Sequence, residues 1–97
     1  MKRAVEVTRQ ANRDLLRLAA FLFDAEAPGA AKKAVRALGR ALRSLETLAE
    51  RGRPSHDGYR ELVVPFGRRA YIVEYRVEWE RVFVTRIFHS LEDRSKA

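Results

Sequence analysis

The hydrophobic pattern of this chain changes from a helical to an alternating period at Gly58, and this change limits the folds that the chain can adopt. Over residues 9–51, apolar residues recur every three or four positions, which is typical of helices with a buried face. After Gly58, apolar and polar residues alternate, which is typical of strands. Because the chain has 97 residues, it fits a single domain over residues 1–97, with two helices ahead of most of its strands.

The part before Gly58 predicts one short strand and two helices. Val5 and Val7 fall on one face of a strand, and Thr8 can cap the helix that follows over residues 9–25. A second helix is expected over residues 28–51, where a proline opens it and a glycine and a proline end it. Since the link between the two helices is short, they should form an antiparallel hairpin.

The first helix carries more apolar residues than one face can hold. Its main stripe is Ala11, Leu15, Leu18 and Leu22, widened by Leu16, Ala19, Phe21 and Phe23. Such a helix must be covered on more than one side, by the sheet or by a partner chain. Leu16, Ala20 and Phe23 are the candidates for a partner contact, and the alternative is that the sheet buries them.

The part after Gly58 predicts three strands, over residues 59–64, 71–77 and 81–89, with a turn at residues 65–67. Short connections make them antiparallel neighbours. The alternation slips in the last strand, and a bulge near Arg86 would restore it. The order β-α-α-β-β-β predicts an α+β domain in which the helical hairpin packs on one face of a mainly antiparallel sheet and the other face is polar.

The chain is strongly basic, with a formal net charge of +7. A positive excess on a small domain attracts DNA, RNA or acidic protein segments. Much of it lies on one side of the second helix, at Lys32, Lys33, Arg36, Arg40 and Arg43. This side is either a phosphate-binding strip or, in the interpretation that we favour, the water-facing side of an amphipathic helix.

Composition excludes several classes of function. The chain has no cysteine, which removes disulfides and thiol catalysis, and its two histidines make a zinc site improbable. No apolar run approaches the roughly 20 residues that span a bilayer. We therefore expect a soluble cytoplasmic protein with no cofactor, no metal and no membrane partner.

Four fragments, in their order and spacing, resemble the RelE/ParE superfamily of toxins from bacterial type II toxin–antitoxin systems. They are VTRQANRDL at 7–15, YREL at 59–62, YIVEYRV at 71–77 and VFVTRIFH at 82–89, with GRP at 52–54 between the first two. The resemblance covers nearly the whole chain. It implies the fold deduced above and a cognate antitoxin that wraps the toxin in a hetero-oligomeric complex.

The superfamily joins two activities on one fold, so fold alone does not choose between them. RelE-like members resemble ribosome-dependent mRNA endonucleases, and ParE-like members poison DNA gyrase. The nucleases carry an arginine where this chain has Ile72, and many end in a catalytic tyrosine where here Ser90 follows His89. These departures favour a ParE-like gyrase inhibitor without catalytic residues. The alternatives are a nuclease that uses Arg86 and His89 on ribosome-bound mRNA, and a domain that retains only antitoxin binding.

Most candidate contact residues lie on or beside the strands. The predicted target-binding residues are Arg60, Arg68, Arg69, Arg76, Arg86, His89 and Arg94. The alternative for the arginines is cross-strand pairing with nearby glutamates. Trp79, at a hairpin tip, is a further candidate for antitoxin binding unless it folds back over the sheet edge.

Overall fold

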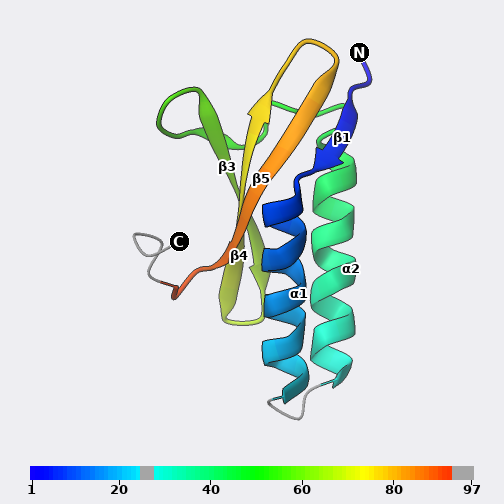
Figure 1. The fold of residues 1–97 in the computed structure, drawn as a ribbon, viewed down its shortest axis with the longest axis vertical. Helices are drawn as coiled ribbons and strands as arrows, with labels where there is room; N and C mark the ends of the chain where they lie inside the picture. The colour runs from blue at the N-terminus through cyan, green and yellow to red at the C-terminus, as the bar shows by residue number, and fades with distance from the viewer. Residues whose placement is uncertain (25–27, 93–97) are drawn as a thin grey trace.

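One five-stranded sheet with the strand order β1-β5-β4-β3-β2 forms the body of the molecule, and two helices lie against it (Figure 1). The computed structural model describes residues 1–24 and 28–92. The elements are β1 (Ala4–Val7), α1 (Arg9–Asp24), α2 (Pro28–Ser44), β2 (Arg53–Pro54), β3 (Tyr59–Phe66), β4 (Arg69–Val77) and β5 (Arg81–His89). β1 pairs parallel with β5, and the other pairs are antiparallel. The predicted α+β fold is confirmed.

The first strand passes directly into the first helix at Thr8. The Thr8 N–H continues the ladder by donating to the Val84 carbonyl at 3.0 Å, and its Oγ1 accepts a hydrogen bond from the Ala11 N–H at 3.2 Å. The same residue therefore ends β1 and caps α1, as the sequence predicts. Because β1 is so short, the second half of β5 has no strand on that side.

The second helix ends at Ser44, so the prediction that it continues to about residue 51 is wrong. Ser44 Oγ donates to the Ala41 carbonyl at 2.6 Å, and Leu45 N–H donates to the Leu42 carbonyl, three residues back, at 3.1 Å. The chain thus tightens into turns after Ser44. Leu45 and Ala49 are nevertheless fully buried, which explains why the apolar spacing continues past the end of the helix.

The predicted turn at residues 65–67 is shorter than expected, because Pro65 and Phe66 belong to β3 and pair with Ala70 and Arg69. Ala70 exchanges hydrogen bonds with Ser90 on the β5 side, so Pro65 faces the open edge and its missing N–H removes no bond between β3 and β4. Gly67, with φ +59°, begins the actual turn.

A β-bulge interrupts β5 beside Arg86, where the sequence predicts it. Tyr75 pairs with Val84 and Glu74 pairs with Arg86, so Thr85 is the extra residue. Its Oγ1 donates to Glu74 Oε1 at 2.7 Å. The bulge lets Val84 and Ile87 both point into the core, where both are fully buried.

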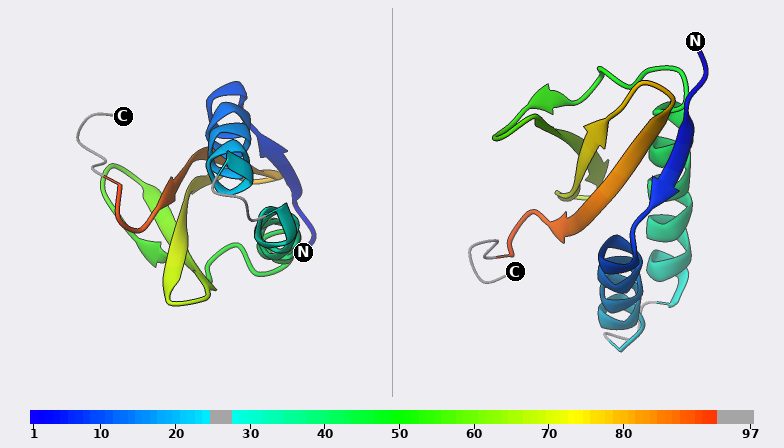
Figure 2. Two further views of the ribbon diagram at one scale, coloured as in Figure 1. Left: turned by 90° about the horizontal axis from the view of Figure 1, so that it is seen from below. Right: turned by 45° about the horizontal axis from the view of Figure 1, so that its top comes forward.

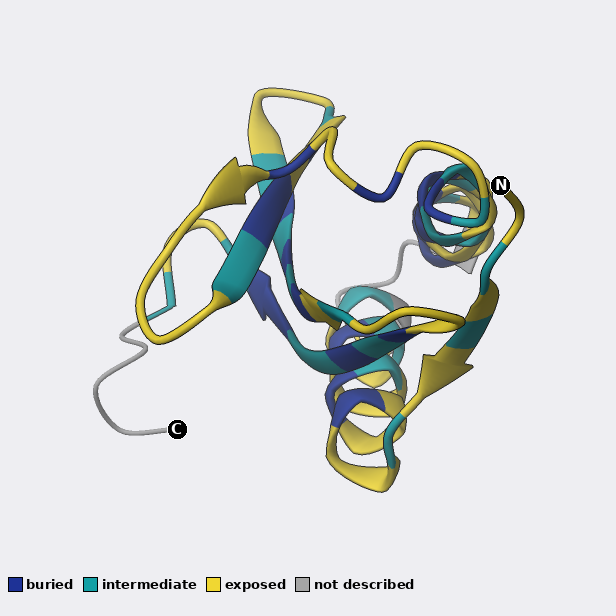
Figure 3. Ribbon diagram, turned by 90° about the horizontal axis from the view of Figure 1, so that it is seen from above, coloured by how far each residue is buried: buried dark blue, intermediate teal, exposed yellow. Residues whose placement is uncertain are grey.

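Both helices cover the same sheet face, as Figure 2 shows from two directions. The core between them is coloured dark blue in Figure 3, and its fully buried members include Ala11, Leu45, Val73, Tyr75, Val82, Val84 and Ile87. The opposite face is less polar than predicted, because the pairing places Val63, Ile72 and Phe88 in one row across it. Among the described residues, no helix is long and apolar enough to cross a membrane.

Gly52 is held where a side chain would not fit, and we expect Gly52→Ala to destabilise the fold. Its N–H donates to Tyr75 Oη at 2.8 Å, and an added Cβ would lie 2.5 Å from that oxygen and 2.9 Å from the Glu61 carbonyl oxygen. Overpacking of this kind lowers the free energy of unfolding by about 1–3 kcal/mol, measurable by urea denaturation. Gly29→Ala is the control, since a Cβ there would have no neighbour within 4 Å. Equal stability of the two variants would contradict this role.

Candidate functional site

A buried carboxylate joins α1 to the unpaired half of β5. Asp14 Oδ2 accepts hydrogen bonds from the Ile87 N–H at 2.9 Å and from Arg86 Nε at 2.8 Å, and Oδ1 accepts one from Arg86 Nη2 at 3.2 Å. The Asp14 side chain is only 2% exposed. Burial by itself raises the pKa of Asp14, but the hydrogen bonds from Arg86 and Ile87 outweigh it and leave that pKa below its ordinary value. Asp14 therefore takes the place of a strand neighbour at this edge.

This arrangement fixes the position of the Arg86 guanidinium. The hydrogen bond to Asp14 raises the pKa of the guanidinium, which also lies over the Phe88 ring at 4.6 Å from its centroid. The side chain is 22% exposed. Nε and Nη2 of Arg86 are thus both bonded to Asp14, which offsets the charge of the guanidinium.

The other predicted target-binding arginines do not gather into one concave cluster. Arg60 donates to the Gly52 carbonyl at 2.7 Å, on the helix side of the sheet, whereas Arg76 lies on the other side, 3.7 Å from Glu78. Arg68 and Arg69 are exposed at the turn between β3 and β4. Arg94 lies outside the described residues.

The sheet face away from the helices has an apolar row at its centre and, next to it, a row of two glutamates flanked by two arginines. Ile72 lies between Val63 and Phe88, and the next row places Glu61 opposite Glu74. Glu61 is 8% exposed and lies 3.4 Å from Arg53. Arg86 follows Glu74 in the same row, so the two arginines of this row already lie against carboxylates, Arg53 against Glu61 and Arg86 against Asp14.

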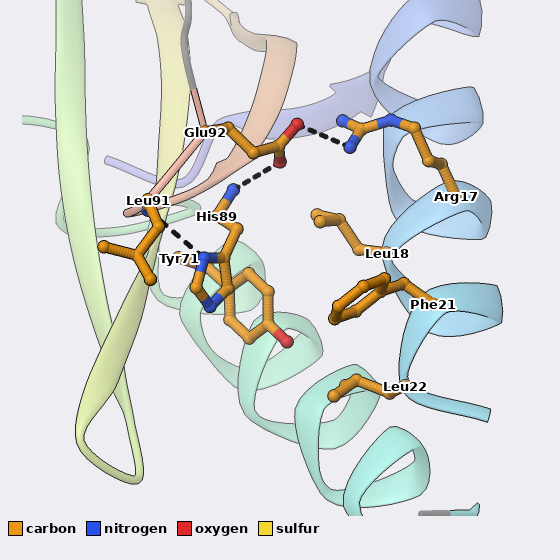
Figure 4. A pocket seen from close by; sticks show the side chains of 8 residues that line it. All are labelled: Arg17, Leu18, Phe21, Leu22, Tyr71, His89, Leu91 and Glu92. Atoms are coloured by element: carbon orange, nitrogen blue, oxygen red, sulfur yellow. Dashed lines mark hydrogen bonds and ion pairs between the residues drawn. The ribbon is translucent and has the colours of Figure 1, made fainter. Parts of the chain in front are cut away.

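His89 lies on the wall of a pocket of about 470 Å³ between the C-terminal half of α1 and the end of β5 (Figure 4). The pocket is lined by Arg17, Leu18, Phe21, Leu22, Tyr71, His89, Leu91 and Glu92. The His89 ring meets the Tyr71 ring edge to face at 5.7 Å, and its Nδ1 accepts a hydrogen bond from the Leu91 N–H at 3.2 Å. Burial raises the pKa of Tyr71, which keeps its hydroxyl neutral.

One ion pair closes the rim of this pocket. Glu92 Oε2 accepts a hydrogen bond from Arg17 Nη1 at 2.6 Å, and Glu92 Oε1 accepts one from the His89 backbone N–H at 2.8 Å. Both carboxylate oxygens of Glu92 are thus bonded to Arg17 of α1 and to the backbone of β5. Among the described residues, no carboxylate is bonded to the imidazole ring of His89. A mostly apolar pocket with one charged rim suits an apolar side chain of a partner better than proton transfer.

The residues predicted to bind an antitoxin are exposed where the structure describes them. The sheet does not bury Leu16, which is 63% exposed, or Ala20. The side chain of Phe23 lies outside the described part. Trp79 is 77% exposed but precedes β5, at the opposite end of that strand from His89, so it does not share a surface with the pocket.

Sequence reasoning did not find the pocket itself. Phe21 is 69% exposed and lies beside the main apolar stripe of α1. The sequence signal for the pocket was that α1 carries more apolar residues than this stripe needs. Tyr71 and His89 come from strands far along the chain. In residues 1–24 and 28–92, no group of three or more histidine, aspartate or glutamate side chains is placed to hold a metal ion.

The α+β fold and this surface can be compared with proteins of known family. Residues 5–94 match the family described as "ParE toxin of type II toxin-antitoxin system, parDE", and the chain belongs to this family. The chain is therefore a small toxin of a type II toxin–antitoxin system, and membership implies a cognate antitoxin as partner.

Two relatives from Caulobacter vibrioides (strain ATCC 19089 / CIP 103742 / CB 15) are similar over almost their whole length. Toxin RelE1 is 41% identical over 90 residues, covering 93% of this chain and 96% of the relative. Toxin RelE3 is 37% identical over 92 residues, covering 95% and 99%. A solved structure, "Chromosomal ParDE TA system from P. aeruginosa", has a TM-score of 0.77 and 26% identity over 91% of this chain and 96% of that one. The names ParE and RelE both occur, so they do not distinguish the two modes of action.

Proposed function

We propose that this toxin acts by binding DNA gyrase and not by cutting mRNA. The observation that carries the proposal is the composition of the sheet face around Ile72. A nuclease needs a cation there to stabilise charge on the scissile phosphate. This chain instead presents an apolar row next to the opposed pair Glu61 and Glu74, and the adjacent Arg86 is held by Asp14.

The second candidate is a RelE-like ribosome-dependent mRNA endonuclease, which the names of the Caulobacter relatives favour. It would use His89 as the acid or base and Arg86 as the cation. The geometry supports it less, because both Arg86 Nε and Nη2 are bonded to Asp14. The His89 ring, for its part, accepts a hydrogen bond from a backbone amide.

Gyrase and ribosome can be separated by adding purified toxin to a gyrase supercoiling assay. We expect loss of supercoiling and accumulation of cleaved DNA. Exposed Arg68 and Arg69 are the first candidates for the contact, so Arg68→Ala/Arg69→Ala should weaken the inhibition. Growth arrest with unimpaired gyrase and cleaved mRNA on ribosomes would contradict the proposal, and His89→Ala should then abolish the cleavage.

We further propose that the antitoxin fills the pocket on α1 and continues over Leu16 and Ala20. Phe21 and Leu91, 69% and 65% exposed, both line it, and exposed apolar side chains beside a pocket mark a protein-binding surface. An antitoxin segment with an apolar anchor residue would cover them. Trp79 precedes β5, at the opposite end of that strand from the pocket, so any contact that it makes is a separate one.

A further inference from the structure

The second helix carries positive charge without any acidic residue to balance it. Its sequence from Pro28 to Ser44 contains five cations and no carboxylate, and all five are exposed. Lys32, Arg36 and Arg40 follow one another at four-residue intervals, so like charges are neighbours on the helix surface and repel. The ion pairs among the described residues all involve other cations. The helix therefore presents an unneutralised basic face.

Part of this face lines a groove. Lys33, Arg36 and Arg40 form one wall of a space of about 440 Å³, whose remaining lining is Ala37 on the helix and Pro65, Phe66 and Gly67 at the β3–β4 turn. No acidic residue lines it. The view from below in Figure 2 shows α2 and this turn facing one another. Lys33 and Arg40 are seven positions apart on the helix, a rise of about 10 Å.

We propose that this groove, which we call the α2 groove, binds the sugar–phosphate backbone of duplex DNA without reading its sequence. Phosphates placed along α2 would meet Arg36, Arg40 and Lys33, and the apolar floor at Ala37 and Phe66 would lie against deoxyribose. Binding through phosphates alone is independent of base sequence and falls steeply with salt.

The groove fits a nucleic-acid backbone better than an acidic peptide. A peptide that runs along β3 would need main-chain hydrogen bonds, but Pro65 has no N–H to offer. The N–H and C=O groups of α2 are used within the helix. A phosphate backbone needs only cations, and cations are what the wall provides. The inference goes beyond the proposed function and does not depend on gyrase being the target.

The test is fluorescence anisotropy of a labelled duplex of about 20 base pairs titrated with the purified full-length chain, at salt concentrations between about 50 and 200 mM. We expect the logarithm of the binding constant to fall linearly with the logarithm of salt, with a slope of about −0.9 for each phosphate contact. No binding at the lowest salt would overturn the proposal. It would leave the gyrase proposal untouched, because the assay contains no gyrase.

A matched pair of double variants locates the binding. Arg36→Gln/Arg40→Gln and Arg9→Gln/Arg13→Gln each remove two exposed arginines four residues apart on one helix, so both lower the net charge equally. The α2 variant should weaken binding about tenfold or more at 50 mM salt and reduce the slope by about 1.8, and the α1 variant should change affinity less than about twofold. If both double variants weakened DNA binding equally, net charge alone would attract the duplex, and the assignment of the site to the α2 groove would be wrong. Circular dichroism should show both variants to be folded.

A second measurement tests whether the floor takes part and which polyanion is preferred. Addition of the duplex should shift the backbone amide resonances of Ala37 and Gly67 in a ¹⁵N–¹H correlation spectrum. Poly-glutamate with the same number of charges should bind more weakly and leave these amides unchanged. If poly-glutamate bound as tightly and gave the same shifts, the groove would be a site for acidic peptides, and the assignment to DNA would be wrong.

Discussion

Replacement of Asp14 by alanine should lower the free energy of unfolding by about 3–5 kcal/mol, because it leaves a partly buried arginine without its counter-ion. The carboxylate also accepts the hydrogen bond of the Ile87 N–H, which β1 is too short to reach. A buried N–H without an acceptor adds to the loss. Domains of this size are stable by only about 5–15 kcal/mol, so a large fraction of the protein should unfold at moderate urea concentrations.

Glu6→Ala is the control for this experiment. Glu6 pairs with Arg81 at 3.5 Å, but both side chains are more than half exposed, so the loss should be below about 1 kcal/mol. Both variants remove one carboxylate from an ion pair between an N-terminal element and β5. Similar stability of the two in urea denaturation would show that the Asp14 network does not hold α1 to the sheet.

The pH dependence gives an independent check of the Asp14 network. The pKa of Asp14 is lower in the folded protein than the ordinary value of 3.8. A carboxyl with a depressed folded-state pKa contributes stability that is complete above the unfolded-state pKa and is lost as the pH falls toward the folded-state value. The stability difference between the natural protein and Asp14→Asn should therefore be constant above about pH 5 and shrink below about pH 4. A difference that stays constant down to pH 3 would rule out the depressed pKa.

The order and type of the elements could be predicted because they depend on local periodicity. The change of period at Gly58 separates helices from the antiparallel strands, and the slip in the last strand predicts the bulge beside Arg86. The end of α2 could not be read in the same way. Leu45 and Ala49 keep the helical spacing because turns also bury them, so apolar pattern alone does not distinguish a helix from the turns that follow it.

The candidate site depends on contacts that periodicity does not contain. Asp14 and Arg86 are 72 residues apart, and an aspartate among arginines on a helix is indistinguishable in sequence from a solvated one. The placement of the strand arginines could not be predicted for a related reason. Side chains alternate between the two faces of a strand, so Arg60 and Arg76 can be assigned to opposite faces only once the pairing register is known. That register is set by the β3–β4 turn. By contrast, exposure of the cations on α2 follows directly from their spacing, and the structure confirms it.

Phe21→Ala should weaken binding of the cognate antitoxin by about 30-fold or more, since apolar anchors in the centre of an interface contribute about 2 kcal/mol or more each. Phe21 is 69% exposed, so its truncation should change the stability of the free toxin by less than about 0.5 kcal/mol. The measurement is isothermal titration calorimetry with the purified antitoxin. It should also show a less negative heat-capacity change, because less apolar surface is buried.

Leu48→Ala is the matched control, because Leu48 is similarly exposed at 57% and lies in the turns after α2, outside the pocket. Its effect on antitoxin affinity should stay within about twofold, as expected for a residue outside the contact. Leu16→Ala distinguishes two positions of the antitoxin. A loss for Phe21→Ala and a smaller loss for Leu16→Ala would place the anchor in the pocket, with the outward side of α1 as its extension. A loss for Leu16→Ala alone would restrict the contact to that outward side, and the pocket at His89 would then be open in the complex.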